Sequence, residues 1–465
     1  MKTTLNIALW LVILFFSCLN HAQAFEGSWT GSIQGMPLIF EITPLGDGYS
    51  AKMQSPKQSK NFFEMDSATV EDGLITIIFD AYKIKYVGEL KDGKIEGTFT
   101  QGPGSAPMTL EKKAYEEVVP DRPQEPKAPF PYKVEDVVFE NPKAGNIKLA
   151  GTLTMPADVE NPPVAIMISG SGPQDRDEQL FFHKPFLVIA DHLAKKGIAV
   201  LRYDDRGVAQ SEGTQANATS LDFATDVEAA VAFLKTRNDI DPEKIGLIGH
   251  SEGGLIAPIV IAANPKDIAF FVSLAGPGVS GTDVLLPQMQ KSVEFQGASP
   301  EAVALEMEIM EAILEKIKNT PDSSNQEVKD AILEIIETKA DAAPENLGSK
   351  YTSEYAQIVA SQFSDTWFRY FVSYDPTPYL EKVSCPVLAL NGSLDYQVIP
   401  EINLPGMKSA FAKANNSDVT ITIRPGLNHL FQNAITGSGS EYATIEETFD
   451  PATLDIISSW INERF

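Results

Sequence analysis

Hydrophobic and polar residues alternate over short stretches in residues 25 to about 112. The clearest runs are residues 38–42, 74–79 and 83–87. Turn triplets that contain glycine and aspartate separate such runs, at residues 46–48, 71–73 and 91–93. Alternation between turns of this kind is typical of antiparallel strands with one buried face. This part of the chain therefore predicts a small β meander, either a barrel or a sandwich.

A second pattern begins near residue 133, where short apolar runs alternate with longer segments of helical periodicity. The apolar runs occupy residues 164–168, 198–201, 245–248, 269–274 and 386–390. Residues 221–234, between two of these runs, place apolar side chains on one helical face. Runs that are apolar throughout are typical of strands covered on both faces. We therefore expect an α/β architecture: a mostly parallel sheet with flanking helices, and a site at the carboxyl ends of the strands.

Residues from about 281 to 375 interrupt this alternation. Two apolar stripes at helical spacing mark the interruption, one at Leu305, Ile309, Ile313 and Ile317 and another at Val328, Ile332, Leu333, Ile335 and Ile336. The stripes predict a helical insertion, or cap, and are best explained by packing of the cap helices on one another.

Proline-rich residues 119–131 separate the two patterns and predict a semi-rigid, extended spacer. We expect a β domain over residues 25–112, a linker over 113–132 and a larger α/β domain over 133–465. A hydrophobic fraction of 43% in 465 residues is ample for two cores.

The first 24 residues have the layout of a secretory leader. Lys2 precedes an apolar run from Ile7 to Phe16, and an A-x-A cleavage site ends at Ala24. The run is too short for a comfortable membrane span. We expect export to the periplasm or the cell exterior and no membrane span after cleavage, with lipid attachment at Cys18 as the alternative.

Candidate chemistry begins at Ser251, in the G-x-S-x-G pattern of residues 249–253. The pattern follows an apolar run and precedes a segment of helical periodicity, which is the strand-turn-helix setting of a nucleophile elbow. A glycine-rich turn can also serve packing alone. A serine hydroxyl needs an adjacent base, usually a histidine that a carboxylate orients.

Elimination among five histidines selects His429 as the base. His21 lies in the leader, His192 is on a predicted helix, and His250 is part of the elbow. His183 is expected to be packed or to lie at a pocket edge. His429 follows the strand-like run 419–423 in a turn, where a base can be presented to the site.

Asp395 is the candidate acid, because it follows the apolar run 386–390 in a turn. A turn aspartate is often only a capping residue. The order Ser251, Asp395, His429 favours the catalytic interpretation, since serine, acid, histidine is the order of α/β-hydrolases.

The chain resembles the α/β-hydrolases, and most closely their bacterial secreted esterase and serine-aminopeptidase-like branch. That branch carries G-x-x-D-x-x-V around its acid and G-x-x-H at its histidine, which are present here at residues 392–398 and 426–429. The resemblance covers residues 133–465, with a break from about 281 to 365. The start of the β domain, around Trp29, resembles the G-x-W opening of lipocalin-like barrels, where the tryptophan either closes the barrel end or contacts a ligand.

The resemblance implies further roles at the site. The oxyanion hole would use the backbone amides of Glu252 and Ser171, with Gly172 as the neighbouring alternative. Asp205 and Arg206, in a stretch similar to the D-x-R-G-x-G-x-S of this branch, are expected to form an ion pair that braces the oxyanion loop.

We therefore expect a serine hydrolase that cleaves carboxylic esters through an acyl-enzyme. The alternatives are a peptidase for short peptides and a binding protein whose hydrolase fold is vestigial, although the complete triad argues against the last. The candidate wall of the substrate pocket is formed by Trp367, Phe368 and Phe371. Acyl chain length and oligomeric state stay open.

Charge and cysteine content narrow the partners. A formal net charge of −26 disfavours nucleic acid and anionic membranes. Cleavage of the leader would leave Cys385 alone, with no intrachain disulfide. No cysteine or histidine cluster has metal-ligand spacing, so we expect neither a metal nor a cofactor.

Overall fold

The computed structural model describes residues 24–33, 36–46, 48–56, 62–79, 83–101, 104–113 and 120–465. The expected leader, with Cys18, lies outside the described residues except for Ala24. The chain divides into two compact units, Met1–Val119 and Pro120–Phe465.

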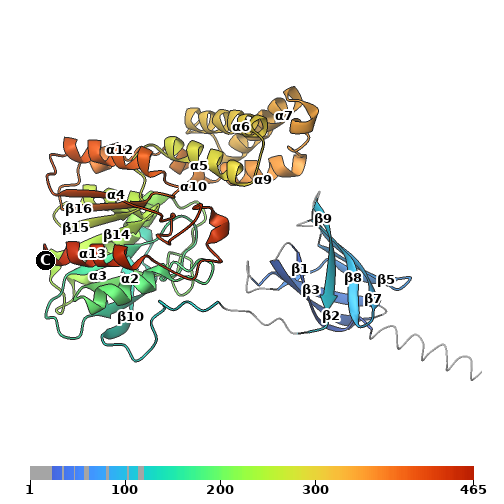
Figure 1. Ribbon diagram of the computed structural model, residues 1–465, viewed down its shortest axis with the longest axis horizontal. Coiled ribbons are helices and arrows are strands. Elements are labelled where there is room, and N and C mark those ends of the chain that lie inside the picture. The colour runs from blue at the N-terminus through green and yellow to red at the C-terminus, as the bar shows by residue number, and fades with distance from the viewer. Residues whose placement is uncertain are drawn as a thin grey trace, which may run out of the picture. The chain divides into compact units, whose positions relative to one another are not determined.

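The first unit is a closed antiparallel barrel (Figure 1). Its strands are β1 (Gly27–Ile33), β2 (Met36–Leu45), β3 (Gly48–Gln54), β5 (Ser67–Glu71), β6 (Leu74–Phe79), β7 (Ile84–Lys91), β8 (Lys94–Gln101) and β9 (Gly104–Glu111). Each strand pairs with the next, and pairing of Thr30 with Glu111 closes the barrel. The short β4 (Phe63–Glu64) adds to β3. Of the two expected forms, the structure has the barrel.

Apolar side chains fill the barrel interior. Trp29 is 1% exposed, and its indole Nε1 donates to the carbonyl of Phe25 at 2.7 Å. The Tyr86 hydroxyl lies 3.0 Å from the carbonyl oxygen of Ile95 and 3.2 Å from that of Met108. Trp29 is therefore a packed core residue with its one polar atom satisfied, as the packing interpretation requires.

The second unit is built on a mixed sheet with strand order β10-β11-β13-β12-β14-β15-β16-β17. Its strands are β10 (Lys133–Asn141), β11 (Ile147–Met155), β12 (Val164–Ile168), β13 (Ala199–Tyr203), β14 (Ile245–His250), β15 (Phe270–Leu274), β16 (Val387–Gly392) and β17 (Val419–Arg424). The first two strands are antiparallel to their neighbours, and the pairs from β13 to β17 are parallel. This is the α/β-hydrolase fold, which confirms the fold class expected from the sequence.

Helices cover both faces of this sheet (Figure 1). One layer packs α3 (Ser220–Lys235), α4 (Gly253–Ala263) and α12 (Pro400–Lys413) on one face, and the other packs α2 (Pro185–Lys195) and α13 (Pro451–Asn462) on the opposite face. Successive residues of β12 enter the two cores alternately, which explains why its sequence is apolar throughout. The short turns η2 (Pro142–Ala144), η3 (Pro242–Lys244) and η4 (Gly439–Glu441) lie in connections.

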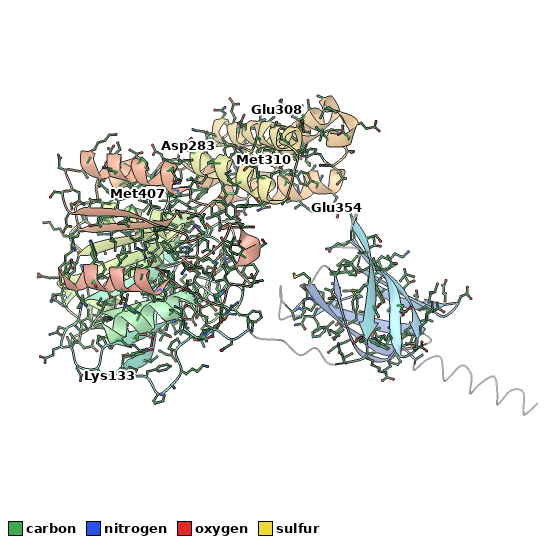
Figure 2. The ribbon with its side chains drawn as sticks, in the orientation of Figure 1. Lys133, Asp283, Glu308, Met310, Glu354 and Met407 are labelled. Atoms are coloured by element: carbon green, nitrogen blue, oxygen red, sulfur yellow. The ribbon has the colours of Figure 1, made fainter. Side chains whose placement is uncertain are left out.

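A helical cap is inserted between β15 and β16. Its helices are α5 (Gly281–Phe295), α6 (Pro300–Asn319), α7 (Asn325–Ala342), α8 (Glu345–Gly348), α9 (Ser353–Phe363) and α10 (Thr366–Ser373), and α11 (Thr377–Leu380) leads back to the sheet. On α6, Met310 is buried whereas Glu308 is exposed (Figure 2). Both expected stripes contribute buried residues to the packing of α6 and α7. Within the described residues, no helix combines the length and apolar character needed to cross a bilayer.

The proline-rich segment is part of the second unit from Pro120 onward. The Arg122 guanidinium is 5% exposed and donates to the carbonyls of Phe181, Ala443 and Ile445. These contacts attach the segment before β10 to the loop between β12 and α2, which contains Phe181, and to the long connection between β17 and α13.

Candidate active site

Ser251 lies on the sharp turn between β14 and α4. Its backbone has a φ of 52°, in the left-handed region that side chains rarely occupy. A Cβ at Gly249 would lie 2.2 Å from the carbonyl oxygen of Gly253, and one at Gly253 would lie 2.1 Å from that of Ile168. The glycines at the outer positions of the motif are therefore required by close backbone approach, and they allow Ser251 to project above the sheet.

Asp395 lies in the turn after β16, and His429 lies in the turn after β17. The His429 Nδ1 lies 2.8 Å from the Asp395 Oδ2, and both side chains are buried. The other oxygen of Asp395 accepts from the amides of Gln397 and Val398 at 2.8 and 2.9 Å. The carboxylate thus has three hydrogen-bond partners, and it fixes the orientation of the His429 imidazole.

Asn428, immediately before the histidine, shapes the His429 loop. It is fully buried, and its side-chain oxygen accepts from the amides of Leu430 and Gln432, both at 3.0 Å. Phe431 adopts a φ of 59° within the same turn. The role of Asn428 was not predicted from the sequence, although an asparagine in a turn is typical of a side chain that accepts from nearby backbone amides.

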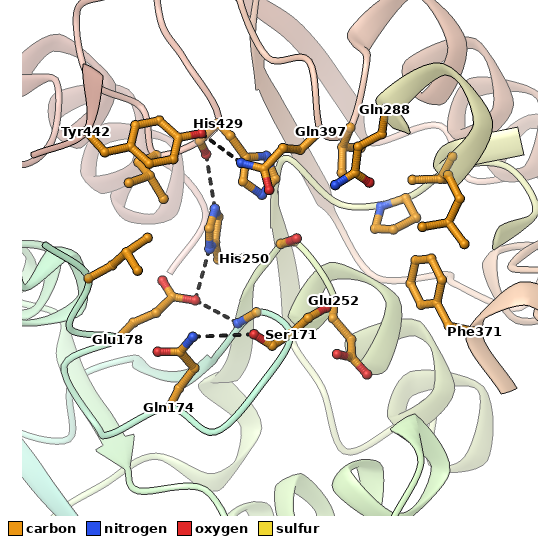
Figure 3. Close-up of a pocket in the computed structure, with 18 of the residues that line it drawn as sticks. Ser171, Gln174, Glu178, His250, Glu252, Gln288, Phe371, Gln397, His429 and Tyr442 are labelled. Carbon is orange, nitrogen blue, oxygen red and sulfur yellow. Dashed lines mark hydrogen bonds and ion pairs between the residues drawn. The ribbon is translucent and has the colours of Figure 1, made fainter. Parts of the chain in front are cut away.

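These residues meet at one cavity of about 260 Å³, at the carboxyl ends of the strands (Figure 3). Its lining includes Ser251, His429, Ser171 and Glu252, whereas Asp395 lies behind the histidine. Further lining comes from Gln174, Leu180, Pro277, Val284, Leu285, Gln288, Gln397, Val398, Leu430 and Tyr442. Gln397 donates to the Tyr442 hydroxyl at 2.7 Å. The lining contains no lysine or arginine.

The loop after β12, residues 169–178, is held from below by the residues that follow β13. The Ser169 hydroxyl donates to Asp205 at 2.7 Å, and the Gln174 amide donates to the same carboxylate at 3.0 Å. Burial raises the pKa of Asp205 to about 7. Asp205 therefore does brace the loop that is expected to carry the oxyanion donor.

Arg206 does not pair with Asp205, so the ion pair expected from the sequence is wrong. Its Nε lies 2.7 Å from the Asp226 Oδ2 on α3, and both side chains are under 10% exposed. Asn141 donates to the same aspartate at 2.6 Å. Neighbouring residues after a strand project to opposite sides, so that Asp205 reaches the loop and Arg206 reaches the helix.

Glu252 presents two different groups to the site. Its carboxylate accepts from the Ser220 hydroxyl at 2.6 Å and from the Trp367 indole at 2.8 Å, and burial raises its pKa above the ordinary value. Its backbone amide, like that of Ser171, donates to no group of the described residues.

The three aromatic candidates for the pocket wall divide into two kinds. Trp367 and Phe371 line the cavity and stack on each other with ring centroids 5.5 Å apart. Phe368 does not line it, which corrects that expectation. It stacks on Phe363 of α9 at 4.2 Å, because positions four apart on α10 share a face and the next residue points into the cap core.

His183 and Cys385, to which no catalytic role was assigned, are both buried. His183 is 1% exposed, between the Thr448 hydroxyl and the Tyr442 carbonyl. Cys385 is a buried free thiol, and burial raises its pKa to about 12, which makes it unreactive.

Comparison with known proteins places the chain among hydrolases. A family model described as serine aminopeptidase, S33, matches residues 185–340, which include the elbow but neither Asp395 nor His429. A curated relative, esterase EstD of Thermotoga maritima, is 23% identical over 479 residues, covering 99% of this chain and 100% of the relative.

Solved structures of esterases are also similar. One is an esterase of Pyrococcus furiosus, at 16% identity, 75% coverage of this chain, 99% coverage of that chain and a TM-score of 0.42. Another is Est1E from Butyrivibrio proteoclasticus with ferulic acid bound, at 19% identity, 70% and 96% coverage and a TM-score of 0.39. The sheet order and the nucleophile elbow show the α/β-hydrolase fold, and the similarity to the serine aminopeptidase model and to esterase EstD supports a serine hydrolase.

Proposed function

We propose that this protein is a carboxylesterase that works through Ser251, His429 and Asp395. The proposal rests on one observation: the elbow serine and a histidine bonded to a buried aspartate line the same cavity. The Oγ of Ser251 attacks the ester carbonyl while His429 accepts the hydroxyl proton. His429 then donates that proton to the departing alcohol. Water then repeats the sequence on the acyl-enzyme and releases the acid.

The negative oxygen of each tetrahedral intermediate would lie between the amides of Ser171 and Glu252. Both amides are without an acceptor in the described part of the chain, as an oxyanion hole requires before substrate arrives. Removing a single donor of this kind typically lowers kcat by about 10²–10³-fold.

The cavity lining supports an uncharged substrate with a short acyl group. Its walls are mainly apolar, and neither lysine nor arginine lines it to bind an anionic substrate. Its volume of about 260 Å³ lies just below the usual range for ligand pockets, about 300–1,000 Å³. The similarity to esterase EstD over the whole chain supports ester hydrolysis.

A second candidate is an aminopeptidase, which the description of the matched family suggests. Glu252 favours it, because this buried carboxylate lines the cavity and forms no ion pair within the described residues, so it could receive a substrate ammonium group. The Ser220 hydroxyl and the Trp367 indole already donate to the Oε1 of this carboxylate, and its raised pKa weakens its charge. We therefore rank ester hydrolysis first.

Initial rates on matched substrates test this proposal. The mature protein is assayed on p-nitrophenyl esters of increasing acyl length and on aminoacyl p-nitroanilides, with Ser251→Ala as control. We expect serine-dependent turnover of short esters and little anilide cleavage. Preferential anilide cleavage would replace the esterase by a peptidase, and ester turnover retained by Ser251→Ala would overturn the mechanism.

We also propose that the protein is exported, on the basis of its first 24 residues. Mass analysis of the N-terminus after expression with secretion tests this. A chain that begins at Phe25 supports the proposal, a lipid on Cys18 supports the alternative anchor, and an intact Lys2 in the cytoplasm refutes both.

A further inference from the structure

His250, the residue before the nucleophile, has a hydrogen-bond acceptor at each ring nitrogen. Its Nδ1 lies 2.9 Å from the Glu178 Oε1, and its Nε2 lies 3.1 Å from the backbone carbonyl of His429 (Figure 3). A carbonyl oxygen can only accept, so the Nε2 must carry a proton. His250 as a whole is 7% exposed, and it lines the cavity.

Glu178 is also an acceptor from both of its neighbours. The same Oε1 accepts from the Gly170 amide at 2.6 Å. The residue is 5% exposed, and as a carboxylate it can accept a second N–H at the same oxygen. With a proton on Nδ1 as well as on Nε2, the His250 ring would donate to both of its acceptors as an imidazolium.

The second buried histidine near the site is bonded differently. His183 has the Tyr442 carbonyl at its Nε2 but the Thr448 hydroxyl at its Nδ1, both at 2.9 Å. A hydroxyl can donate, so a neutral ring satisfies both contacts, and burial lowers the pKa of His183. At His250 burial also opposes the charge, but Glu178, the His429 carbonyl and Asp395 together outweigh it and raise the pKa of His250.

We propose that His250 is an imidazolium at neutral pH and that, together with Glu178, it braces the oxyanion loop against the loop of the base. One end of this brace holds the amide of Gly170, immediately before Ser171, and the other holds the backbone of His429. The roles of Ser171 and His429 rest on the proposed function, whereas the charge on His250 does not. His250 and Glu178 are positioning residues, since neither needs to touch the substrate.

The charged groups that surround His250 agree with this assignment. Glu178 approaches from the loop after β12, and the His429 ring lies with its centroid 4.8 Å from that of His250. Asp395, behind His429, adds a second negative charge that raises the pKa of His250. A local positive charge is thus matched by carboxylates on two sides, as a buried ion requires.

Imidazole nitrogen NMR of the full mature chain tests the charge directly. At pH 7 the doubly protonated pattern is expected for His250 and a neutral pattern for His183. A neutral His250 at pH 7 would overturn the proposal, whatever substrate the enzyme turns over. The wild-type measurement also stands if a variant fails to fold.

Glu178→Gln tests the brace. Without the charge His250 becomes neutral, and the three hydrogen bonds from Gly170 to residue 178, to His250 and to the His429 carbonyl cannot all persist. If the glutamine oxygen accepts from Gly170, the neutral ring loses one of its bonds, and if the glutamine amide donates to His250, the Gly170 bond is lost. We expect kcat on a short ester to fall roughly 10- to 100-fold, with KM little changed, because the loops lose their mutual position. Activity should recover partly at lower pH, where the imidazolium forms again.

Thr448→Val is the matched control, because it removes a buried partner from His183. It should lower stability and leave the pH profile and the His250 pattern unchanged. A pH profile of Glu178→Gln that coincides with that of wild type would reduce Glu178 to a packing role. If no ester is cleaved at all, the rate of fluorophosphonate labelling of Ser251 replaces kcat, which separates failure of this inference from failure of the proposed function.

Discussion

The barrel and the hydrolase unit bury different chemistry. Among the described barrel residues no charged side chain is buried, and Tyr86 and Trp29 direct their polar atoms to nearby carbonyls. The hydrolase unit buries Glu178, Arg206, Asp226, His250, Glu252 and Asp395, which hold loops or helices at the site. Buried charge is costly unless it is paired. Its concentration in one unit marks that unit as the one that carries the chemistry.

The largest effect is expected when a buried charge of the hydrolase unit is removed at Asp395. Asp395→Asn keeps the shape of the turn but can present its amide nitrogen to His429, which favours the wrong tautomer. We expect kcat to fall about 10⁴-fold. Steady-state kinetics on a p-nitrophenyl ester measures this, and a loss below tenfold would remove Asp395 from the mechanism.

The barrel side is tested by Trp29→Ala. Truncation of this fully packed residue should cost about 3–5 kcal/mol in the free energy of unfolding of the barrel. Since every residue that lines the cavity belongs to the second unit, kcat/KM on esters should not change. Denaturant unfolding and kinetics on the same preparation measure both quantities, and a clear fall in kcat/KM would give the barrel a part in catalysis.

The burial of charge itself is tested through Asp205. Its folded pKa of about 7 lies above the unfolded value of about 3.9, so the folded state holds the proton more tightly. The stability that this group contributes is present below pH 4 and is lost as pH rises through 7, by roughly 1 kcal/mol per pH unit.

Asp205→Asn should remove this dependence. Chemical denaturation from about pH 4 to about pH 8 should therefore show a difference in stability between wild type and variant that changes with pH. A difference that is constant over this range would mean that Asp205 titrates normally.

The smallest effect distinguishes two adjacent aromatic residues of the cap. Trp367→Ala enlarges the cavity and should shift ester preference toward longer acyl groups, with changes in kcat/KM of roughly tenfold. Phe368→Ala, its neighbour in the cap core, should lower stability and leave the acyl preference alone. Rates across the acyl series decide, and equal profiles for the two variants would place the acyl group elsewhere.

Local patterns predicted the fold because they depend on neighbours in the chain. Alternation of hydrophobic and polar residues predicted the barrel strands, and apolar runs such as 164–168 predicted strands buried on both faces. Ser251, Asp395 and His429 were selected because each follows a strand, and parallel strands bring their carboxyl ends to one edge.

The buried charge network could not be predicted in the same way, because its partners are far apart in the chain. Glu178 and His250 are 72 positions apart, and no local sequence pattern near either residue predicts their contact. Arg206 was assigned to its neighbour Asp205, although the true partner lies 20 positions away on a helix. The prediction that Phe368 lines the pocket was wrong for a related reason, since the face of α10 on which it lies is set by how the helix packs.

The central claim is that Ser251 forms the covalent acyl-enzyme. Its most direct test is to label the full mature protein with a fluorophosphonate and locate the adduct by peptide mass spectrometry, with His429→Ala as the inactive-base control. The account predicts one adduct per chain, on Ser251, formed much more slowly in the control. An adduct on another residue, or none on wild type that hydrolyses esters, would contradict it.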